Sequence, residues 1–394
     1  MNHPITIGRL IPMFTGKFGG PYNHIMDLTS YLKKMGIKTN IYTTSYVAQK
    51  GRERTYFFEK KSKNFNIYRF HSFLKFREYR ISFKFFPFLL KEAKNIDLFH
   101  SHAVRTFQED IGCLISLMKK KPVIITPHGG ISINWDYGDK IPKMIHDKLI
   151  GYLKRKLLKP HFIAVSKNEI SIIKKFGIDN DYIHYIPDGV NTQLYRYVDP
   201  TDLKKKYNVV ESDIILHVGP INKGKGVDKL IKILNFIVQK NKNVKLFIIG
   251  EDSGYLHVVK SLIYKYNLSD YVIFTGFISR YNLAKYYSMA DLVVYPSRQE
   301  IFGHVIIESG ACGRVVIGSD IMGPSEIIID GKTGFTSDFK NYTELSDLIL
   351  ELLNDKKRLI QMGKEAIERV KAEFSWEKSA ISHIELYKKV LNSD

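Results

Sequence analysis

Two glutamates, Glu300 and Glu308, lie eight positions apart on either side of a Phe302-Gly303 step. A loop that opens into a helix at this step leaves several backbone N–H groups without partners inside the helix, and the positive end of the helix dipole attracts phosphate. One glutamate would lie in the loop beside the anion and the other about two turns into the helix. We therefore expect a ligand with a diphosphate in its middle and hydroxylated sugars at both ends.

A lysine in a second loop is a candidate partner for the same diphosphate. Lys225 lies in segment 222–226, after a predicted strand and before a helix that begins near Val227. A loop at the carboxyl end of a strand can bring an ammonium group to an anion bound there. The alternative is a solvated surface lysine, and Lys223 in the same segment is the weaker candidate.

These loops belong to a pattern that runs along the whole chain. Short apolar runs alternate with helical patterns, which is typical of parallel sheets with helices on both faces. The predicted strands cover residues 5–11, 38–43, 96–100, 122–126, 162–165, 214–218, 245–249, 272–274, 292–295 and 315–317. A helix is expected near 23–35 after a glycine-rich turn at 16–20, and a linker over 189–200. We predict two doubly wound α/β domains, whose ligands bind beyond the carboxyl ends of the strands.

The composition is that of an ordinary globular protein. With 394 residues, 44% of them apolar, the chain can form two hydrophobic cores. It has no uninterrupted apolar run of about eighteen residues, and its first residues do not resemble a signal peptide. Cys113 and Cys312 lie far apart and match no metal-ligand spacing. We expect a reduced, cytoplasmic protein.

The positive charge is concentrated in the first half of the chain. The formal net charge is +20, and residues 1–190 hold 32 Lys and Arg against 15 Asp and Glu, a net of +17. Such a field attracts nucleic acid, anionic lipid headgroups or an acidic substrate. Segment 73–88 mixes aromatic residues with cations, and a basic helix is predicted over 141–159. Both favour an anionic membrane surface, and the alternative for both is a helix that covers the core.

Short motifs occur in a fixed order along the chain. They are Gly-Gly at 19–20, Thr-Pro-His-Gly-Gly at 126–130, Ala-Val-Ser-Lys at 164–167, Ile-Pro-Asp-Gly-Val-Asn at 186–191, Lys-Gly at 225–226, Phe-Thr-Gly-Phe at 274–277, Ala-Asp at 290–291, Tyr-Pro-Ser at 295–297, the segment 300–308 and Phe-Ser-Trp at 374–376. In this order the motifs resemble those of the retaining nucleotide-sugar glycosyltransferases of family 4. The resemblance implies the α/β GT-B architecture, in which two Rossmann-like domains face a central cleft. It implies an acceptor-binding domain over 1–195, completed by a crossing helix over 376–394, and a donor-binding domain over 196–375.

The resemblance also implies roles for individual residues. His128 would contact a sugar hydroxyl at the reaction centre, and Glu300 would bind donor-sugar hydroxyls or lie beside the anomeric carbon. The expected donor-binding residues are Gly19, Gly20, Lys225, Phe302, Gly303, His304, Glu308, Phe277 and Ile278. The glycine pair would let the backbone approach the diphosphate, and Glu308 would accept hydrogen bonds from the ribose. The alternatives are structural: a core histidine, a turn, and helix-cap or surface glutamates.

Several positions depart from the family pattern. Pro220 stands where the family usually has an arginine that helps to bind the diphosphate, so more of that task falls to Lys225. The other departures are Ile301 for glycine, Arg314 for proline, Pro324 for glycine, and an exchange of the usual Asn and Asp at Asp188 and Asn191. These changes could tune the donor or lower activity, and an inactive regulatory glycosyltransferase is one alternative.

The reaction implied by the family moves a sugar from a nucleotide-diphosphate sugar to an acceptor hydroxyl, with retention and without a protein nucleophile. No acidic pair of the DxD type lies in a suitable loop, so lysine and the helix dipole are expected to replace a metal ion, and no cofactor is expected.

The expected partners are a nucleotide-sugar donor and a glycan, lipid or lipid-linked acceptor. The basic N-terminal domain is also expected to contact the anionic inner face of the cell membrane, and no nucleic acid is expected. The alternatives are a GT-B nucleotide-sugar epimerase, a phosphorylase, or a basic protein that binds nucleic acid or anionic surfaces. The epimerase should lack the segment 300–308, and no recognisable nucleic-acid-binding signature supports the last alternative.

Overall fold

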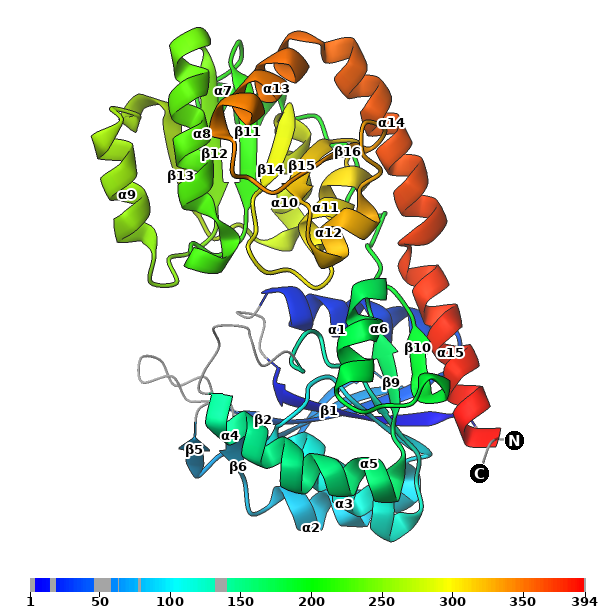
Figure 1. Cartoon of the computed structure of the whole chain (residues 1–394). Helices are drawn as coiled ribbons and strands as arrows, with labels where there is room; N and C mark the ends of the chain where they lie inside the picture. Colours follow the sequence, from blue (N-terminus) through cyan, green and yellow to red (C-terminus); the bar gives the residue numbers. More distant parts are fainter. Residues whose placement is uncertain are drawn as a thin grey trace. The chain divides into compact units, whose positions relative to one another are not determined.

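The chain divides into two compact units, one of residues 1–187 with 376–394 and the other of residues 188–375 (Figure 1). The computed structural model describes residues 4–14, 19–45, 58–62, 64–76, 79–131 and 140–392. Each unit has a parallel sheet with helices on its faces, so the predicted fold class of two Rossmann-like α/β domains is confirmed. The division at Pro187 falls just before the expected linker.

The first unit is built on a sheet whose described strands have the order β10-β9-β8-β7-β1-β2-β4-β3. All neighbours pair in parallel except β3, which runs antiparallel to β4 at the edge. The strands are β1 (Thr6–Met13), β2 (Lys38–Ser45), β3 (Phe58–Ser62), β4 (Phe65–His71), β7 (Leu98–Ser101), β8 (Val123–Ile125), β9 (His161–Ala164) and β10 (Ile183–Tyr185). The helices are α1 (Gly19–Lys34), α2 (Phe85–Glu92), α3 (Phe107–Lys119), α4 (Lys140–His146), α5 (Tyr152–Leu158), α6 (Lys167–Lys175) and α15 (Trp376–Asn392).

Helices cover both faces of the first sheet, because alternate residues of each strand point to opposite faces. Ile7 of β1 lies in a buried cluster with residues of α1 and α15, including Trp376 and Tyr387. Leu10 of the same strand lies in a second cluster with residues of α2, α3 and α6. The last helix of the chain is therefore part of the core of the first unit.

The second unit has an all-parallel sheet of strand order β13-β12-β11-β14-β15-β16. Its strands are β11 (Asp213–Val218), β12 (Val244–Ile249), β13 (Val272–Gly276), β14 (Leu292–Tyr295), β15 (Val315–Ser319) and β16 (Gly334–Ser337). Its helices are α7 (Thr201–Lys206), α8 (Val227–Lys240), α9 (Leu256–Lys265), α10 (Arg280–Met289), α11 (His304–Ala311), α12 (Met322–Ile327), α13 (Tyr342–Asn354) and α14 (Lys356–Glu373). Strand order reverses between β11 and β14, and sheets of this kind bind ligands at the carboxyl ends of the strands at that point.

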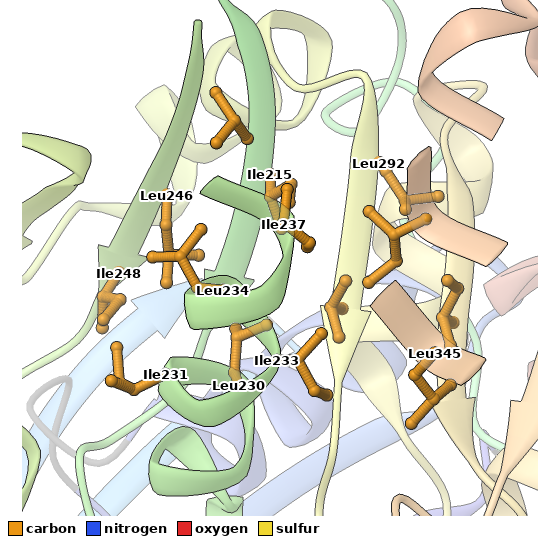
Figure 2. Close-up of a cluster of buried hydrophobic side chains, with 14 of the residues drawn as sticks. Ile215, Leu230, Ile231, Ile233, Leu234, Ile237, Leu246, Ile248, Leu292 and Leu345 are labelled. Atoms are coloured by element: carbon orange, nitrogen blue, oxygen red, sulfur yellow. The ribbon is translucent and has the colours of Figure 1, made fainter. Parts of the chain in front are cut away.

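Aliphatic side chains fill the core of the second unit (Figure 2). Helix α8 presents Leu230, Leu234 and Ile237 on one face, at the three- and four-residue spacing of an amphipathic helix. These side chains pack on strand residues such as Leu246 and Leu292. This packing fixes the end of β11 and the start of α8, and therefore the loop that carries the candidate lysine.

Two stretches differ from the sequence-based expectations. Helix α1 begins at Gly19, so the glycine pair forms the first turn of the helix instead of the turn before it. In segment 73–88, β5 (Leu74–Phe76) pairs antiparallel with β6 (Tyr79–Ile81) and α2 begins at Phe85, so the alternative of one helix over the whole segment is wrong. Within each of these two strands one cationic residue stands between two apolar ones, which is the two-residue period of a strand. None of the helices in the described parts of the chain is both long and apolar enough to span a bilayer.

Candidate functional site

The predicted donor-binding residues of the second unit all lie at the carboxyl edge of its sheet. Lys225 follows β11, and Glu300 lies in the loop from β14 to α11. Strands β11 and β14 are the two strands at the switch point. Phe277 and Ile278 follow β13, two strands away from β11 in the sheet. Phe277 is exposed and Ile278 is half-buried.

The loop of Lys225 is held against the loop of Glu300. Gly226 has a φ of +68°, and a Cβ there would lie 2.0 Å from the Pro296 carbonyl oxygen, so only glycine permits this approach. Arg298 donates from both terminal nitrogens to the carboxylate of Asp228 at 2.8 and 2.7 Å. The Arg298 backbone N–H donates to the Gly224 carbonyl at 2.7 Å. These contacts make the two loops one structural unit.

Lys225, Tyr295 and Glu300 form a polar triad at this junction, in which Tyr295 is buried and the other two are half-buried. The Lys225 Nζ donates to the Glu300 carboxylate at 2.7 Å and to the Tyr295 hydroxyl at 2.6 Å. The Tyr295 hydroxyl in turn donates to Glu300. Two of the predicted residues are thus brought together, and Tyr295 is a third member to which the sequence pattern assigned no role.

The triad fixes the charge of its members. Burial alone would lower the pKa of Lys225, but Glu300 and Tyr295 outweigh it and raise that pKa. Burial alone would raise the pKa of Glu300, but the charge and hydrogen bond of Lys225 lower it. Burial and Glu300 raise the pKa of Tyr295. At neutral pH the triad therefore contains an ammonium, a carboxylate and a neutral phenol.

Helix α11 begins at His304, with Gly303 as its N-cap at a φ of +108°. A glycine has no side chain to cap the first N–H groups of the helix. The buried Phe302 anchors the preceding turn, and its ring lies 6.0 Å from that of Phe374. A Cβ on Gly323 would lie 2.1 Å from the Phe302 carbonyl oxygen, so a glycine is needed where α12 meets this turn. The helix begins at the predicted position, and its amino end has no side-chain cap, a feature shared by helix ends that bind anions.

Two further site residues are fixed by partners within the second unit. The imidazole of His304 forms an ion pair with Asp188 at 3.0 Å. Burial alone would lower the pKa of His304, but Asp188 raises it. The Tyr287 hydroxyl donates to the Glu308 carboxylate at 2.8 Å, and burial raises the pKa of Glu308. The departure from the family pattern at Asp188 thus supplies the partner of His304.

In the first unit, Gly19 and Gly20 form the amino end of α1, and His128 lies in the turn after β8. His128 has a φ of +48°, in the left-handed region that a non-glycine residue rarely adopts. The buried Glu169 accepts hydrogen bonds from the backbone N–H groups of Gly129 at 2.7 Å and of Val165 at 2.9 Å. Strained backbone held in place by a buried carboxylate is typical of a functional turn.

A group of buried side chains lies behind His128 in the first unit. The Nδ1 of His102 lies 3.3 Å from the Nε2 of His128, and the guanidinium of Arg9 contacts the Nε2 of His102. The ligand nitrogens of His24, His102 and His128 all lie within 4.8 Å of one another, which is a possible metal-ligand set. The spacing of these residues in the sequence did not predict this cluster, although His100-Ser-His102 at the end of a predicted strand was a signal for it.

Two protein families match the chain, one in each half. The family Glycosyltransferase Family 4 matches residues 18–194, and the family Glycosyl transferases group 1 matches residues 199–369. An uncharacterised glycosyltransferase of Methanocaldococcus jannaschii is 30% identical over 311 residues, which are 76% of this chain and 77% of that protein.

Other curated relatives match a smaller part of the chain. The N-acetyl-alpha-D-glucosaminyl L-malate synthase of Bacillus anthracis is 30% identical over 59% of this chain and 60% of its own length. A GDP-mannose-dependent alpha-(1-6)-phosphatidylinositol monomannoside mannosyltransferase of Mycobacterium tuberculosis is 29% identical over 50% of this chain and 53% of its own length. The match thus spans about 60% and about half of these two relatives.

Solved structures of the GT-B fold resemble the whole chain. The sucrose-phosphate synthase of Thermosynechococcus elongatus gives a TM-score of 0.79 at 22% identity, covering 99% of this chain and 100% of that one. The Anabaena protein HepE in complex with UDP-glucose gives 0.76 at 18% identity, covering 99% and 100%. The Methanocaldococcus jannaschii relative matches about three quarters of this chain, and the solved structures share its fold. The chain therefore belongs to the family 4 glycosyltransferases with the GT-B fold.

Proposed function

We propose that the protein transfers a sugar, with retention of configuration, from a nucleotide-diphosphate sugar to an acceptor hydroxyl. The observation that carries this proposal is the Lys225–Glu300 pair beside the amino end of α11, at the switch point of the second sheet. The relative that uses GDP-mannose and the structure that holds UDP-glucose are consistent with such a donor. Retention follows from the resemblance to the family.

The triad suits a ligand that has both a diphosphate and sugar hydroxyls. The diphosphate would compete with Glu300 for the Lys225 ammonium, and the N–H groups at the start of α11 would bind the same anion. Glu300 would then accept hydrogen bonds from the donor sugar, while Tyr295 holds its position. Departure of the nucleoside diphosphate requires stabilisation of negative charge, which Lys225 and the helix dipole supply.

We also propose that the reaction needs no metal ion. Lys225 and the amino end of α11 place positive charge where a divalent cation would otherwise neutralise the leaving group. Turnover should therefore be equal with EDTA and with added Mg²⁺ or Mn²⁺. Loss of turnover in EDTA, restored by either ion, would contradict this part of the proposal.

The direct test is a thermal-shift panel of UDP-, GDP-, ADP- and TDP-sugars. One of them should raise the melting temperature of the wild-type protein, and the shift should be lost in Glu308→Gln, which weakens the proposed ribose contact. Product analysis by NMR should show the anomeric configuration of the donor. No shift with any donor, or an inverted product, would count against the proposal.

A second observation supports an acceptor at a membrane. In the helical segment from α4 through a π-helix (Asp147–Gly151) to α5, some of the polar side chains form ion pairs with the rest of the first unit. Lys154 forms ion pairs with Glu109 at 2.6 Å and with Asp110 at 2.7 Å, both on α3. Arg105 forms a further ion pair with Asp147 at 2.7 Å.

Three apolar side chains spread along the same segment are exposed. Ile141 is 70% exposed, Leu149 62% and Leu157 56%. Lysines 140, 148 and 156 are exposed among them. The predicted basic helix corresponds to α4, the π-helix and α5, and of its apolar side chains Leu158 packs on the core cluster while the larger part is exposed. An outward apolar face rimmed by lysines is typical of docking on an anionic bilayer.

We therefore propose that this face docks on the anionic inner surface of the cell membrane, where a lipid or lipid-linked acceptor is presented. Flotation with vesicles of neutral phosphatidylcholine and of phosphatidylcholine with phosphatidylglycerol tests this. The wild type should float with the anionic vesicles, and Leu149→Glu should reduce binding roughly tenfold. The matched control is Ile360→Glu on α14, where a 61% exposed isoleucine lies in the second unit. Equal absence of binding to both vesicles, or binding to random DNA instead, would contradict this proposal.

A further inference from the structure

Arg9 is a buried guanidinium at the centre of the first unit, on β1. It contacts two neutral side chains: the Nε2 of His102, and the hydroxyl of Tyr387 at 3.2 Å. An arginine only donates hydrogen bonds and has no acceptor. Both neighbours must therefore present a lone pair to Arg9. This fixes where His102 and Tyr387 carry their own protons, and so which group each of them donates to.

Two branches of hydrogen bonds start at Arg9, one through His102 and one through Tyr387. The first branch leads to His128 in the candidate reaction centre. Because the Nε2 of His102 accepts from Arg9, the proton of the neutral His102 ring lies on Nδ1. Burial, together with His100 and Arg9, lowers the pKa of His102 well below its ordinary value, so the ring is neutral. Its Nδ1–H then faces the Nε2 of His128 at 3.3 Å and donates to it. The Nε2 of His128 is thus an acceptor, and the proton of this ring lies on Nδ1.

The second branch follows the same rule from Arg9 through Tyr387 and His100. The Tyr387 oxygen accepts from Arg9, so its O–H donates to the Nδ1 of His100 at 2.9 Å. The Nε2–H of His100 then donates to the Thr126 hydroxyl at 2.8 Å. This branch ends at the Thr126 hydroxyl, two residues before His128, and it serves as the comparison for the branch through His102.

We propose that Arg9 and His102 hold His128 as the tautomer with its proton on Nδ1, so that His128 serves the bound sugar as a hydrogen-bond donor and not as a base. Arg9 and His102 are positioning residues in this scheme. The assignment of the tautomer stands on the first unit alone. The part that concerns the bound sugar rests on the proposed function.

Two observations on the surroundings of His128 agree with one fixed orientation of its imidazole ring. Its backbone is held in the left-handed region by the Glu169 contact with the next residue, Gly129. Its ring packs edge-on against that of His24 at 4.9 Å and nearly parallel to that of His102 at 5.6 Å. Both the turn and the ring orientation are thus defined before any hydrogen bond to a ligand forms.

The same geometry argues against a metal ion among the three histidines. A metal-bound imidazole uses one lone pair for the metal and carries its proton on the other nitrogen. His102 cannot do both, because Arg9 occupies the lone pair of Nε2 and Nδ1 must carry the proton. A divalent cation would also lie close to a buried guanidinium, which is electrostatically unfavourable. The cluster of His24, His102 and His128 is therefore better explained as a proton-ordering network.

The test is ¹⁵N NMR of the histidine side chains in the intact protein near neutral pH. The chain has 13 histidines, and the signals of His128 are assigned by their loss in His128→Gln. The wild type should show a protonated Nδ1 and an unprotonated Nε2 for His128. In His102→Leu this pattern should shift toward the Nε2–H tautomer that a solvated imidazole prefers. His102→Asn, which keeps a donor near the position of Nδ1, should restore the pattern at least in part.

Kinetics supply a second readout that loss of packing alone would not reproduce. With an active donor, His102→Leu should lower kcat about tenfold with a smaller change in KM, and His102→Asn should recover much of that loss. Tyr387→Phe breaks the other branch, so it should lower thermal stability but leave the His128 tautomer unchanged.

Three results would overturn the proposal. They are an Nε2–H or doubly protonated His128 in the wild type, an unchanged tautomer in His102→Leu, and tight zinc binding that is lost in both His24→Ala and His102→Ala. If the tautomer is as stated but no nucleotide-sugar binds, the hydrogen-bond network stands and the proposed function fails.

Discussion

Single residues at the edge of the second sheet act as a coupled group. Lys225 and Glu300 were expected to serve different parts of one ligand, and the structure joins them through an ion pair at 2.7 Å. Tyr295 contacts both of them. Because Pro220 has no donor where the family has arginine, the proposed function requires Lys225 and the helix end to carry more of the anion binding. A change in any member of the triad should therefore alter the position of the other two.

Tyr295→Phe tests this coupling. The substitution removes one hydroxyl that accepts from Lys225 and donates to Glu300, and it keeps the charges of both residues. A hydrogen bond to a charged group is worth about 1.5–3 kcal/mol, so kcat/KM should fall roughly tenfold to a hundredfold. Tyr264→Phe on α9, where the tyrosine is 83% exposed, is the control and should have no effect. Wild-type kinetics in Tyr295→Phe would show that the phenol has no positioning role.

The sequence could predict that the candidate site residues of the second unit lie at one edge of its sheet, but not their contacts. Lys225 and Glu300 lie at strand ends, and strand ends of a parallel sheet share one edge, so their proximity follows from the pattern. The role of Tyr295 does not follow, because a tyrosine that ends a buried strand is usually a core residue. The network of Arg9 and His102 was missed for a similar reason. The hydrogen-bond partner of a polar side chain in a strand cannot be identified from the sequence until the neighbouring strand is known.

Among the elements, the segment from α4 to α5 is unusual because ion pairs attach it to the protein and its apolar side faces out. His146 contributes through Asp110 at 3.0 Å and Asp147 at 3.7 Å. Burial alone would lower the pKa of His146, but hydrogen bonding to these carboxylates raises it to about 9. The attachment of this segment should therefore depend on pH.

The sign of this dependence follows from the raised pKa. The unfolded chain has an ordinary histidine pKa of about 6.5, so the stabilisation from His146 is fully present below that value and is lost as the pH rises through about 9. The melting temperatures of wild type and His146→Gln should therefore differ most near pH 6 and converge near pH 10. A difference that stays constant over this range would show that His146 is not charged in the fold.

Hydrogen exchange checks that the effect is local. Backbone amides of α4 and α5 should exchange faster in His146→Gln at about pH 6, while those of α8 in the second unit should not change. Faster exchange in both units would mean that the substitution weakens the whole chain and not the attachment of this segment.

At the scale of the whole molecule, the first unit depends on the last residues of the chain, which return to it after the second unit. Residues 376–394 belong to the first unit, although they follow the second unit in the sequence. Trp376 is 2% exposed in the core of the first unit. The two units have separate cores, so their unfolding transitions should separate when one of them is weakened.

Trp376→Ala should destabilise the first unit by about 3–5 kcal/mol, the usual loss for a buried aromatic side chain. Urea denaturation followed by hydrogen exchange should show the transition of the first unit moving to lower urea while that of the second unit stays in place. Ile381→Ala on the same helix, at a 45% exposed position, is the control and should change stability little. A single transition that shifts as one would show that the units unfold together.

The central claim is that the Lys225 triad binds the diphosphate of a nucleotide-sugar. Calorimetric titration of the preferred donor into wild type, Lys225→Met and Lys223→Met tests it most directly, because the two lysines share one short loop. We predict that Lys225→Met weakens binding roughly tenfold to a hundredfold and that Lys223→Met binds as the wild type does. Equal affinity in all three proteins, or an equal loss in both variants, would contradict the claim.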